Sequence, residues 1–545
     1  MDLHNACLTL CAAFLVGYFL RQRRRWSSVR DVPGPETPSW VFGHQWYFQN
    51  EEAGVVEKNF LERYGNVVRW RGPFGDDRLW VSDPKAIHHI LHKGGYNYAK
   101  SKDEREQARL ITDYSVGWAD GEVHRRHRRA MTPAFGTANI KDLLPTFMKF
   151  ANKLTDKWHD VIENEESRDS ATIDANMWFG KATLDAIGAG AFEYDFSSLD
   201  NTDNLLARSY QNLFVEVFGG ATKGITFIMD IIRWLPSGLL TWLLFDIRAL
   251  PEMENLRLNR KEAHIVARRL IEAKRQELKD GTARKDILSS LVKAGATQRP
   301  DSSMSDDEIV AQVRGLMLAG HETTAKSLTF AIWELAKHPE FQEKLRAEIC
   351  GALEMVRARG GVNFDVNDFG NMPHLVAVIK ETLRMHPIAV DIPMRMSRAA
   401  DILPLTKPFI GLSGKVYNEL PIPAGATIVI STFGYNQNPD LWGPNAYEFR
   451  PERWFDMNEK PESPVGMYGN LVTFSGGVRS CLGWRFSVVE MQAFIVTLVR
   501  QFKFSLADGN PPIRRRRPGI LVPMVAGEEE KGAQLPIKVT ALRND

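Results

Sequence analysis

The sequence predicts a mainly α-helical protein with a small β component, formed as one large domain behind an N-terminal transmembrane helix. Helical periodicity dominates from about residue 121 to residue 386, and strand-like alternation is confined to short segments on either side. No Pro-, Ser- or Gly-rich break divides the chain after Pro38. The 545 residues, 44% of them hydrophobic, can bury a large core, and we predict the main domain over residues 49–545.

The first 20 residues are predicted to form a membrane anchor. Residues 3–20 are mostly apolar, and as a helix they would be about 27 Å long, close to the thickness of an endoplasmic-reticulum bilayer. Arginines follow at once, which places the rest of the chain in the cytosol. A cleaved signal peptide would carry its basic residues before the apolar stretch, so we expect a retained anchor in the endoplasmic-reticulum membrane.

A basic and proline-rich linker is predicted over residues 21–48, because its prolines favour a stiff, extended chain. A helix and two strands joined by a turn should follow, then a short helix opened by Pro84. Ser305 and Glu308 form the pattern of a capping box at the start of a long helix. In chain order, the predicted elements are a helix over 52–64, strands over 66–72 and 77–83, and helices over 84–93, 305–337, 342–359, 372–386 and 483–501; the arginine run 514–517 is predicted to be a solvated loop.

Charge and cysteine content exclude several classes of protein. Lys plus Arg number 69 and Asp plus Glu 67, so the chain as a whole lacks the basic excess of a nucleic-acid-binding protein. Four scattered cysteines are too few for a disulfide framework, and without a CxxC pair they do not suggest a zinc ribbon.

Cys481 has the most informative surroundings, in the segment FSGGVRSCLG that runs from Phe474 to Gly483. The paired glycines would allow a tight turn and a close approach of the backbone to a flat cofactor. Cys481 precedes a predicted helix, whose N-terminus would lower the pKa of the thiol. Arg479 could pair with a carboxylate of the cofactor. The alternative is a buried structural cysteine after a glycine-rich loop.

This segment resembles the haem-ligand loop of the cytochrome P450 superfamily, F-x-x-G-x-R-x-C-x-G, at every fixed position. Three more motifs occur in the family's order: AGHETT at 319–324, E-x-x-R at 381–384 and FRPERW at 449–454. The resemblance implies the cytochrome P450 fold, haem b as cofactor and Cys481 as the axial ligand of the haem iron. Among the family, the chain most resembles the microsomal, fungal-like members. The resemblance also implies that Phe474 and Gly483 lie against the haem.

Glu322 and Thr323 lie in the middle of a long helix that is apolar on most sides, where a buried acid and hydroxyl need a reason. An exposed polar face is the ordinary explanation. The resemblance implies instead that Thr323 and Glu322 are catalytic and deliver protons during oxygen activation. Gly320 would leave room for a ligand beside the helix.

The two haem propionates need cationic partners. The resemblance assigns this task to Arg479, to His124 and Arg128 in the place of the family's W-x-x-x-R, and to either Arg395 or Arg398, between which the spacing does not choose. Glu381, Arg384 and Arg453 are expected to form a buried ion network with a structural task. The neighbouring Arg125, Arg126 and Arg129 are either a solvated face or a docking patch for an acidic electron donor.

The resulting prediction is a monooxygenase that inserts one oxygen atom of O₂ into a lipophilic small molecule, such as a terpenoid or another secondary metabolite. No nucleotide-binding fingerprint is present, so NADPH electrons would come from a separate cytochrome P450 reductase. Membrane lipid is the other expected partner, and residues 225–245 would either dip into the membrane or form a buried helix pair. The alternatives are a haem-thiolate isomerase or dehydratase that needs no O₂, and a haem electron carrier or sensor without enzymatic activity.

The substrate pocket is also expected from the resemblance, and its walls should be mostly apolar. The segments expected to line it are 111–118, 214–218, 316–323, 389–392 and 520–521.

Overall fold

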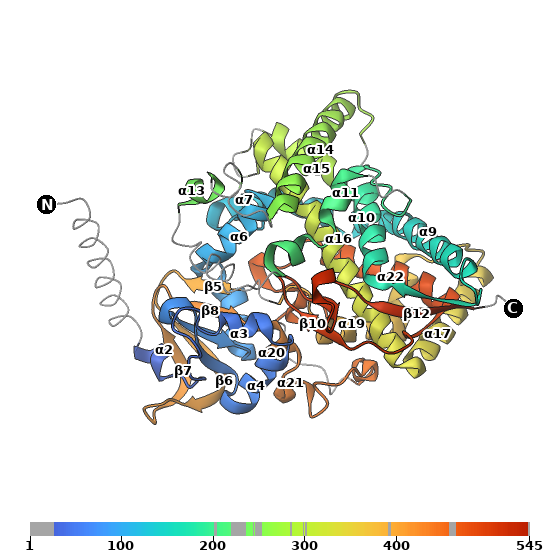
Figure 1. Cartoon of the computed structure of the whole chain (residues 1–545). Helices are drawn as coiled ribbons and strands as arrows, with labels where there is room; N and C mark the ends of the chain where they lie inside the picture. Colours follow the sequence, from blue (N-terminus) through green and yellow to red (C-terminus); the bar gives the residue numbers. More distant parts are fainter. Residues whose placement is uncertain are drawn as a thin grey trace.

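The computed structural model describes residues 27–200, 204–219, 236–242, 245, 253–283, 286–297, 299, 302–390, 394–456 and 465–542. Helices predominate in this part of the chain, as predicted (Figure 1). The α-helices are α2 Ser27–Asp31, α3 Gln45–Asn50, α4 Val55–Tyr64, α5 Pro84–His88, α6 Lys102–Thr112, α7 Gly121–Met131, α8 Thr137–Asp142, α9 Leu144–Glu163, α10 Ala175–Phe192, α11 Leu205–Tyr210, α13 Ser237–Thr241, α14 Glu254–Lys279, α15 Ile287–Ala296, α16 Asp306–Lys337, α17 Pro339–Ala358, α18 Val366–Gly370, α19 Pro373–Met385, α20 Thr432–Asn436, α21 Pro439–Trp442 and α22 Trp484–Gln501.

The described strands form small sheets, and the largest joins two distant parts of the chain. Its order is β1-β2-β8-β5-β3, with the predicted hairpin β1–β2 at one edge and a parallel pairing of β2 with β8. Figure 1 shows this as blue and orange strands lying together. The other sheets are β4-β12-β9, β6-β7 and β10-β11. The strands are β1 Val67–Arg71, β2 Asp77–Val81, β3 Tyr98–Lys100, β4 Ser170–Asp174, β5 Met394–Ser397, β6 Asp401–Ile410, β7 Val416–Ile422, β8 Thr427–Ile430, β9 Phe502–Leu506, β10 Ile513–Arg516, β11 Val522–Val525 and β12 Pro536–Ala541.

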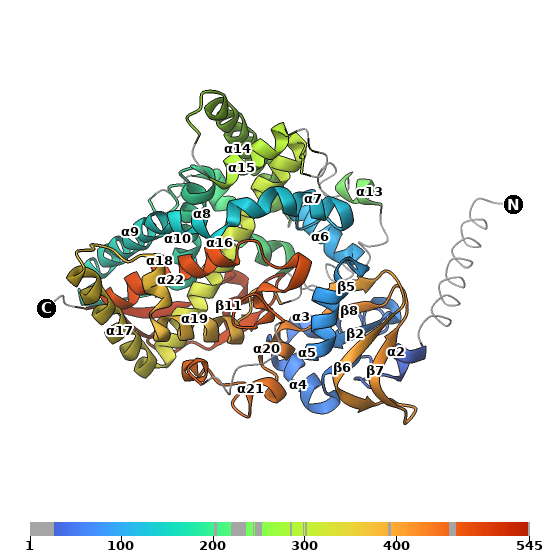
Figure 2. The same ribbon diagram turned by 180° about the vertical axis from the view of Figure 1, so that it is seen from behind.

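The helical part is organised around α16, which runs through its middle in both views (Figures 1 and 2). It packs against α10, α14, α19 and α22. Its residues are buried on nearly every side, which explains why its sequence shows little amphipathic contrast. The main core therefore surrounds α16, and a smaller core lies under the β1-β2-β8-β5-β3 sheet.

From Ser27 onward, the segment predicted as a linker packs on the sheet. Val29 and Val32 are fully buried in the core of that sheet. The Asp31 carboxylate accepts hydrogen bonds from the Tyr417 hydroxyl at 2.8 Å and the Ser413 hydroxyl at 2.7 Å. These contacts hold the first described residues of the chain against the sheet.

Some local predictions were wrong; the helix expected over 342–359, for example, begins at Pro339. The helix expected from residue 52 begins at Val55, because Gly54 adopts a left-handed conformation with φ of 93°. The arginine run is not a solvated loop, because its first three residues belong to strand β10, paired with β11. Arg517 is 4% exposed, and its guanidinium donates to Glu57 at 2.6 Å. The carboxylate partner, distant in sequence, permits this burial.

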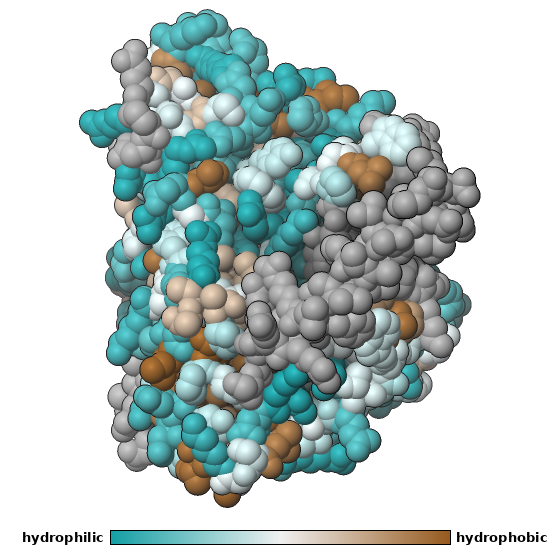
Figure 3. Space-filling view, turned by 90° about the vertical axis from the view of Figure 1, so that its left-hand side faces the viewer, coloured by the Kyte–Doolittle hydropathy of each residue, from teal (hydrophilic) through white to brown (hydrophobic). Residues whose placement is uncertain are grey.

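The predicted anchor at residues 1–20 and most of residues 225–245 lie outside the described residues. Among the helices that the structure describes, none combines the length and the apolar character needed to cross a bilayer. On the face drawn in Figure 3 the described surface is mostly hydrophilic, with hydrophobic residues in small separate groups. Isolated exposed hydrophobic residues of this kind are ordinary.

Candidate active site

Helix α16 carries the predicted oxygen-activation residues past a central cavity. It begins after Ser305, whose hydroxyl accepts the Glu308 N–H at 3.2 Å, while the Glu308 carboxylate accepts the Ser305 N–H at 2.9 Å. This is the predicted capping box, and the helix ends at Lys337 as predicted. Gly320 lines the cavity, but a side chain there would meet Ile187 at 2.8 Å. The absent side chain therefore leaves room mainly for Ile187.

The cavity has a volume of about 410 Å³ and lies between α16 and the loop that carries Cys481. Cys481 and Thr323 both line it, and the Thr323 hydroxyl donates to the Ala319 carbonyl at 2.8 Å. Most of its wall is apolar, with Leu316 and Ile388 among the contributors. The structure thus brings the predicted ligand and the predicted catalytic hydroxyl to one chamber.

Cys481 is held just before helix α22. Its backbone N–H donates to the Phe474 carbonyl at 2.9 Å, and Gly483 caps the helix. Cys481 lines the cavity, and its side chain is accessible from it. Burial raises the pKa of this thiol, and the Gly483 N–H and Arg128 offset only part of the effect. The predicted lowering by the helix N-terminus was therefore wrong for the free thiol, because desolvation outweighs the helix. A bound metal ion would supply the charge that favours the thiolate.

The paired glycines before Cys481 serve close packing of the backbone. Gly477 has φ of 63°, and a side chain there would lie 1.8 Å from the carbonyl oxygen of Leu91. At Gly476 a side chain would lie 2.2 Å from the carbonyl oxygen of Val465. The expected close approach is therefore made to the protein's own backbone, and it holds the cysteine loop against the segment around Leu91.

One end of the cavity is strongly basic. Lys100, Arg128, Arg395 and Arg479 line it together with one acid, Glu104. Burial, helped by the nearby arginines and opposed by Glu104, lowers the pKa of Lys100 to about 8. Arg128 also donates to the Ser480 carbonyl at 2.7 Å, which ties it to the cysteine loop.

Asp120 partly balances these cations, because it pairs with Arg479. Asp120 also accepts the backbone N–H of Lys100 at 3.1 Å. The Arg479 Nε atom, in contrast, is buried without a hydrogen-bond partner among the described residues. The four cations outnumber the one acid, Glu104, in this part of the cavity wall, so the lining carries an excess of positive charge. Such a lining suits the two carboxylates of one haem, so the donor set fits the expected cofactor.

His124 lines the same end and is neutral. Its Nδ1 atom lies 2.8 Å from the Tyr96 hydroxyl. Burial and the cations around it lower the pKa of His124 to about 3. If the Tyr96 hydroxyl donates to Nδ1, the other ring nitrogen carries the proton and can donate to a carboxylate.

The structure distinguishes the two candidate arginines that the sequence left open. Arg395 lines the cavity, is 4% exposed and donates to Glu104 at 3.2 Å. Arg398 is 52% exposed and pairs with Asp120 at 3.3 Å, behind Arg479. Its side chain is not among the described residues that line the cavity. Arg395 is thus the one in position to meet a bound carboxylate.

Glu322 and Thr323 face different chambers. Glu322 lines a second cavity of about 350 Å³, together with His321 and Lys326. Its carboxylate lies 3.1 Å from the Lys326 ammonium and 3.7 Å from the His321 ring. Burial by itself would raise the pKa of Glu322, but Lys326 and His321 outweigh it and lower the pKa to about 2. Glu322 is therefore ionised. It lines the second cavity, while its neighbour Thr323 on the same helix turn lines the first.

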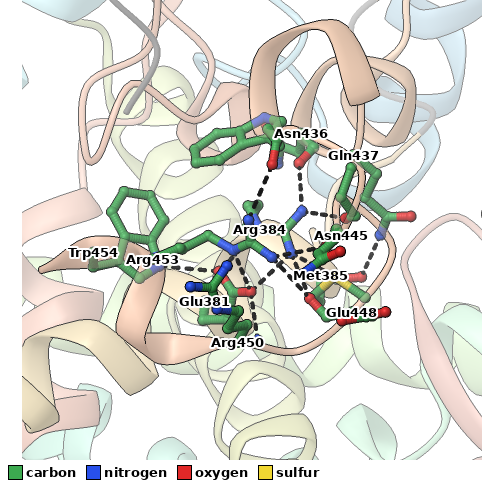
Figure 4. A network of polar contacts seen from close by, with 12 residues as sticks. Glu381, Arg384, Met385, Asn436, Gln437, Asn445, Glu448, Arg450, Arg453 and Trp454 are labelled. Atoms are coloured by element: carbon green, nitrogen blue, oxygen red, sulfur yellow. Dashed lines mark hydrogen bonds and ion pairs between the residues drawn. The ribbon is translucent and has the colours of Figure 1, made fainter. Parts of the chain in front are cut away.

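The predicted ion network is present and fully buried (Figure 4). The Glu381 carboxylate accepts from Arg384 at 2.9 and 2.8 Å and from Arg453 Nε at 2.9 Å. It also accepts from the Arg450 N–H at 2.8 Å and the Trp454 ring N–H at 3.0 Å. These five donors converge on one carboxylate, so the network joins α19 to residues 450–454. It lies outside the cavity, in agreement with a structural task.

For the arginines beside Arg128, the sequence left two explanations, a solvated face or a docking patch for an electron donor. Arg126 donates to the Glu308 carboxylate at 2.8 Å and to the Ser303 carbonyl at 2.6 Å. It thereby joins α7 to the start of α16. Arg125 pairs with Glu122 at 2.6 Å on the exposed face of α7. Arg126 is thus engaged within the protein, and the docking explanation remains for the exposed side.

A family model described as Cytochrome P450 matches residues 33–528. The chain belongs to the cytochrome P450 family. It is 32% identical over 519 residues to Cytochrome P450 monooxygenase 205 of Postia placenta, covering 94% of this chain and 93% of the relative. It is 33% identical to Cytochrome P450 monooxygenase 128 of the same fungus and 30% identical to Cytochrome P450 monooxygenase claW of Ampulloclitocybe clavipes, each over 98% of this chain and 96% or more of the relative.

The chain is therefore a P450 monooxygenase of fungal type, and haem is its cofactor. Its cavity is lined by two residues that the motifs did not indicate, Lys100 and Glu104, and a third, Asp120, pairs with Arg479 beside it. No local pattern marks them, because a lysine at the end of a strand and acids at the starts of helices are ordinary surface residues. Only the fold buries them beside Arg395 and Arg479.

The predicted substrate walls were partly correct. The segments 111–118, 316–323 and 389–392 contribute lining residues, including Thr112, Val116 and Ala389, although residues 391–392 are outside the described part. Segments 214–218 and 520–521 are not among the described lining residues. Ile520 and Leu521 instead belong to a buried cluster beside the cavity. Their apolar character serves packing in this structure.

Proposed function

We propose that the enzyme inserts one oxygen atom of O₂ into a lipophilic small molecule, with NADPH electrons supplied by a separate cytochrome P450 reductase. The observation that carries the proposal is that one cavity is lined by Cys481, by the cluster of cations, and by Thr323 together with apolar residues. Such a lining favours a substrate with little charge. Terpenoids and other lipophilic secondary metabolites are the classes we propose.

We assign the predicted site residues the following roles in binding the haem. Cys481 would hold the haem iron through its sulfur, while Lys100, Arg128, Arg395 and Arg479 bind the two propionates and His124 donates to one of them. Arg398 would act on Arg479 through Asp120. Phe474 and Gly483 line the cavity beside Cys481 and would lie against the haem. Bound in this way, haem supplies the activation of O₂ and the transfer of one oxygen atom.

Thr323 and Glu322 would deliver protons to the cavity. The Thr323 hydroxyl lies at the cavity wall and can donate a hydrogen bond into it once its bond to Ala319 breaks. Glu322, ionised beside Lys326, can take up a proton from the second cavity and pass it toward the helix turn of Thr323. We infer that the second cavity is the solvent side of this relay.

The test is consumption of NADPH by the purified protein with a cytochrome P450 reductase, O₂ and candidate lipophilic compounds. Product that contains one atom of labelled O₂ and requires NADPH is expected. An isomerase or dehydratase would convert its substrate without NADPH, and an electron carrier would give no product. Cys481→Ser is the control, since it should abolish both the product and the red-shifted absorbance of the reduced carbon monoxide complex.

We also propose that residues 1–20 anchor the enzyme in the endoplasmic-reticulum membrane with the catalytic part on the cytosolic side. The apolar stretch at 3–20 and the arginines that follow it support this proposal. A reductase in the same membrane would then meet the enzyme on that side.

A further inference from the structure

Two neighbouring hydroxyl groups, those of Thr112 and Ser115, line the haem cavity. Their oxygen atoms lie 2.8 Å apart. Gly315 of α16 lies against the pair, because a side chain there would meet the Ser115 Cβ atom at 3.2 Å and the Thr112 Cβ atom at 3.7 Å. Val116 and Leu316, the next residues along the chain, are apolar and also line the cavity. A few polar groups in a mostly apolar wall fix the orientation of a ligand.

Both hydroxyl protons are used inside the protein. The Thr112 hydroxyl donates to the Ala108 carbonyl at 2.9 Å, so the proton between the two oxygen atoms comes from Ser115. The Ser115 oxygen also accepts the Gly117 N–H at 3.2 Å. A hydroxyl group has one proton and two lone pairs, so on these contacts each oxygen keeps one lone pair and has no proton left to give. The pair can therefore accept a hydrogen bond from a ligand but cannot donate one.

The segment that carries the pair is strained at Asp113, between the two hydroxyl residues. Asp113 has φ of 52°, in the left-handed region that favours glycine. Its carboxylate pairs with Arg314 and, at 2.9 Å, with Arg260. Arg314 is 2% exposed and also donates to the Ile111 carbonyl at 3.1 Å. Strain of this kind persists only where the surrounding structure enforces it, and it is concentrated at functional sites. The buried arginine thus holds the backbone that presents the two oxygen atoms to the cavity.

We propose that Thr112 and Ser115 bind a hydroxyl group of the substrate, so that the enzyme acts on a lipophilic alcohol. The substrate hydroxyl donates its proton to the free lone pairs of the pair, and the apolar wall holds the carbon skeleton. A ketone has no proton to donate, and its oxygen would face the two lone pairs. A hydrocarbon would leave both oxygen atoms without this partner in a space closed to water. The proposal rests on the function proposed above and names the substrate class for it.

The position of the pair on α16 also bears on where the new oxygen atom enters. Thr323 lies eight residues after Gly315, which is roughly 12 Å along the helix at 1.5 Å per residue. A substrate held by its hydroxyl group beside Gly315 therefore presents a distant carbon to the turn of Thr323. A step that leaves a hydroxyl group on the skeleton, such as a hydroxylation or the reduction of a carbonyl group, must come before this enzyme.

The first test measures binding to the haem-loaded full-length enzyme in its ferric state, by the shift of haem absorbance and without NADPH. The probes are three sesquiterpenoids with one skeleton: nootkatol carries a hydroxyl group, nootkatone a carbonyl group at the same carbon, and valencene neither. Nootkatol should bind roughly three- to tenfold more tightly than each of the others, the usual size of one hydrogen bond. Equal affinity for the three, or no shift with any of them, would overturn the proposal.

Variants assign this preference to the pair. Thr112→Val keeps the shape of the side chain without its oxygen, and Ser115→Ala removes the other oxygen. Each should abolish most of the preference for nootkatol while the affinity for valencene stays the same, whereas a loosened fold would weaken all three probes alike. Ser327→Ala is the matched control, because Ser327 also lines the cavity but its hydroxyl donates to the Thr323 carbonyl at 2.9 Å, beyond the turn of Thr323 on α16. A control that loses the preference as fully as Ser115→Ala would refute the role of the pair.

The second test adds NADPH and a cytochrome P450 reductase. The product from nootkatol should carry its new oxygen atom on a carbon remote from the hydroxyl group, and insertion at the carbon next to that group would contradict the proposed orientation. If no NADPH-dependent product forms with any compound, the proposed function fails. The binding preference, measured without NADPH, still decides whether Thr112 and Ser115 recognise an alcohol.

Discussion

Replacement of Glu381 by glutamine should destabilise the enzyme strongly without touching the cavity. The substitution exchanges one acceptor oxygen for an N–H donor. Placed at the less crowded oxygen, the new donor would face the Arg384 Nε and the Trp454 ring N–H, which now bond there at 2.9 and 3.0 Å. Each buried donor left without an acceptor costs about 1–3 kcal/mol, so the loss is about 2–6 kcal/mol. Breaking a buried ion pair costs about 3–5 kcal/mol, which agrees.

The assay is denaturant unfolding of the haem-loaded full-length protein, followed by haem absorbance. The loss should be a large share of a total stability of about 5–15 kcal/mol, so poor haem retention during expression is expected as well. Glu452→Gln is the control, because Glu452 makes an exposed ion pair with Lys344 at 3.0 Å, and such pairs contribute less than about 1 kcal/mol. If Glu381→Gln lost no more stability than this control, the reasoning about the buried network would be wrong.

The remaining predictions concern the cavity, acid stability and the N-terminus. Thr323→Ala should keep haem and substrate binding but divert NADPH electrons to hydrogen peroxide, with product formation down by about 10²-fold; unchanged coupling would mean that the hydroxyl only packs. Arg395→Leu should lower haem retention, measured by haem-to-protein ratio, far more than Arg398→Leu, and equal effects would contradict the assignment. Because the folded-state pKa of Glu322 is lowered from 4.5 to about 2, its stabilising contribution is present above pH 4.5 and is lost as the pH falls toward 2; Glu322→Gln should therefore lose less unfolding free energy over that range than wild type. Removal of residues 1–25 should release much of the protein from membranes with haem binding intact, measured by fractionation and absorbance, and loss of haem would refute the anchor.

The helices near the cysteine could be predicted because local signals mark their ends. The capping box at Ser305 and the proline at the start of α5 act over a few residues, so they can be read without the fold. The Cys481 loop could be predicted for the same reason, since its fixed positions lie within ten residues.

What could not be predicted depends on segments that meet only after folding. The choice between Arg395 and Arg398 rests on the pairing of β5 with β3 and β8, which turns one of them toward the cavity. The task of Gly477 depends on Leu91, and the burial of Arg517 depends on Glu57. The predicted lowering of the Cys481 pKa was wrong, because burial raises the pKa by more than a helix end lowers it, and burial cannot be read from the sequence.

The order of strands in the largest sheet has a consequence for synthesis of the chain on the ribosome. Strand β2 ends at Val81, but its parallel neighbour β8 ends at Ile430, about 350 residues later. At about 5–20 residues per second, the exposed edge of the β1–β2 hairpin must wait roughly 20–70 s for its partner. An unpaired edge strand is a template for aggregation, so the nascent chain should depend on chaperones during this interval. The helical part between them can form in the meantime, which leaves closure of this sheet as a late step of folding.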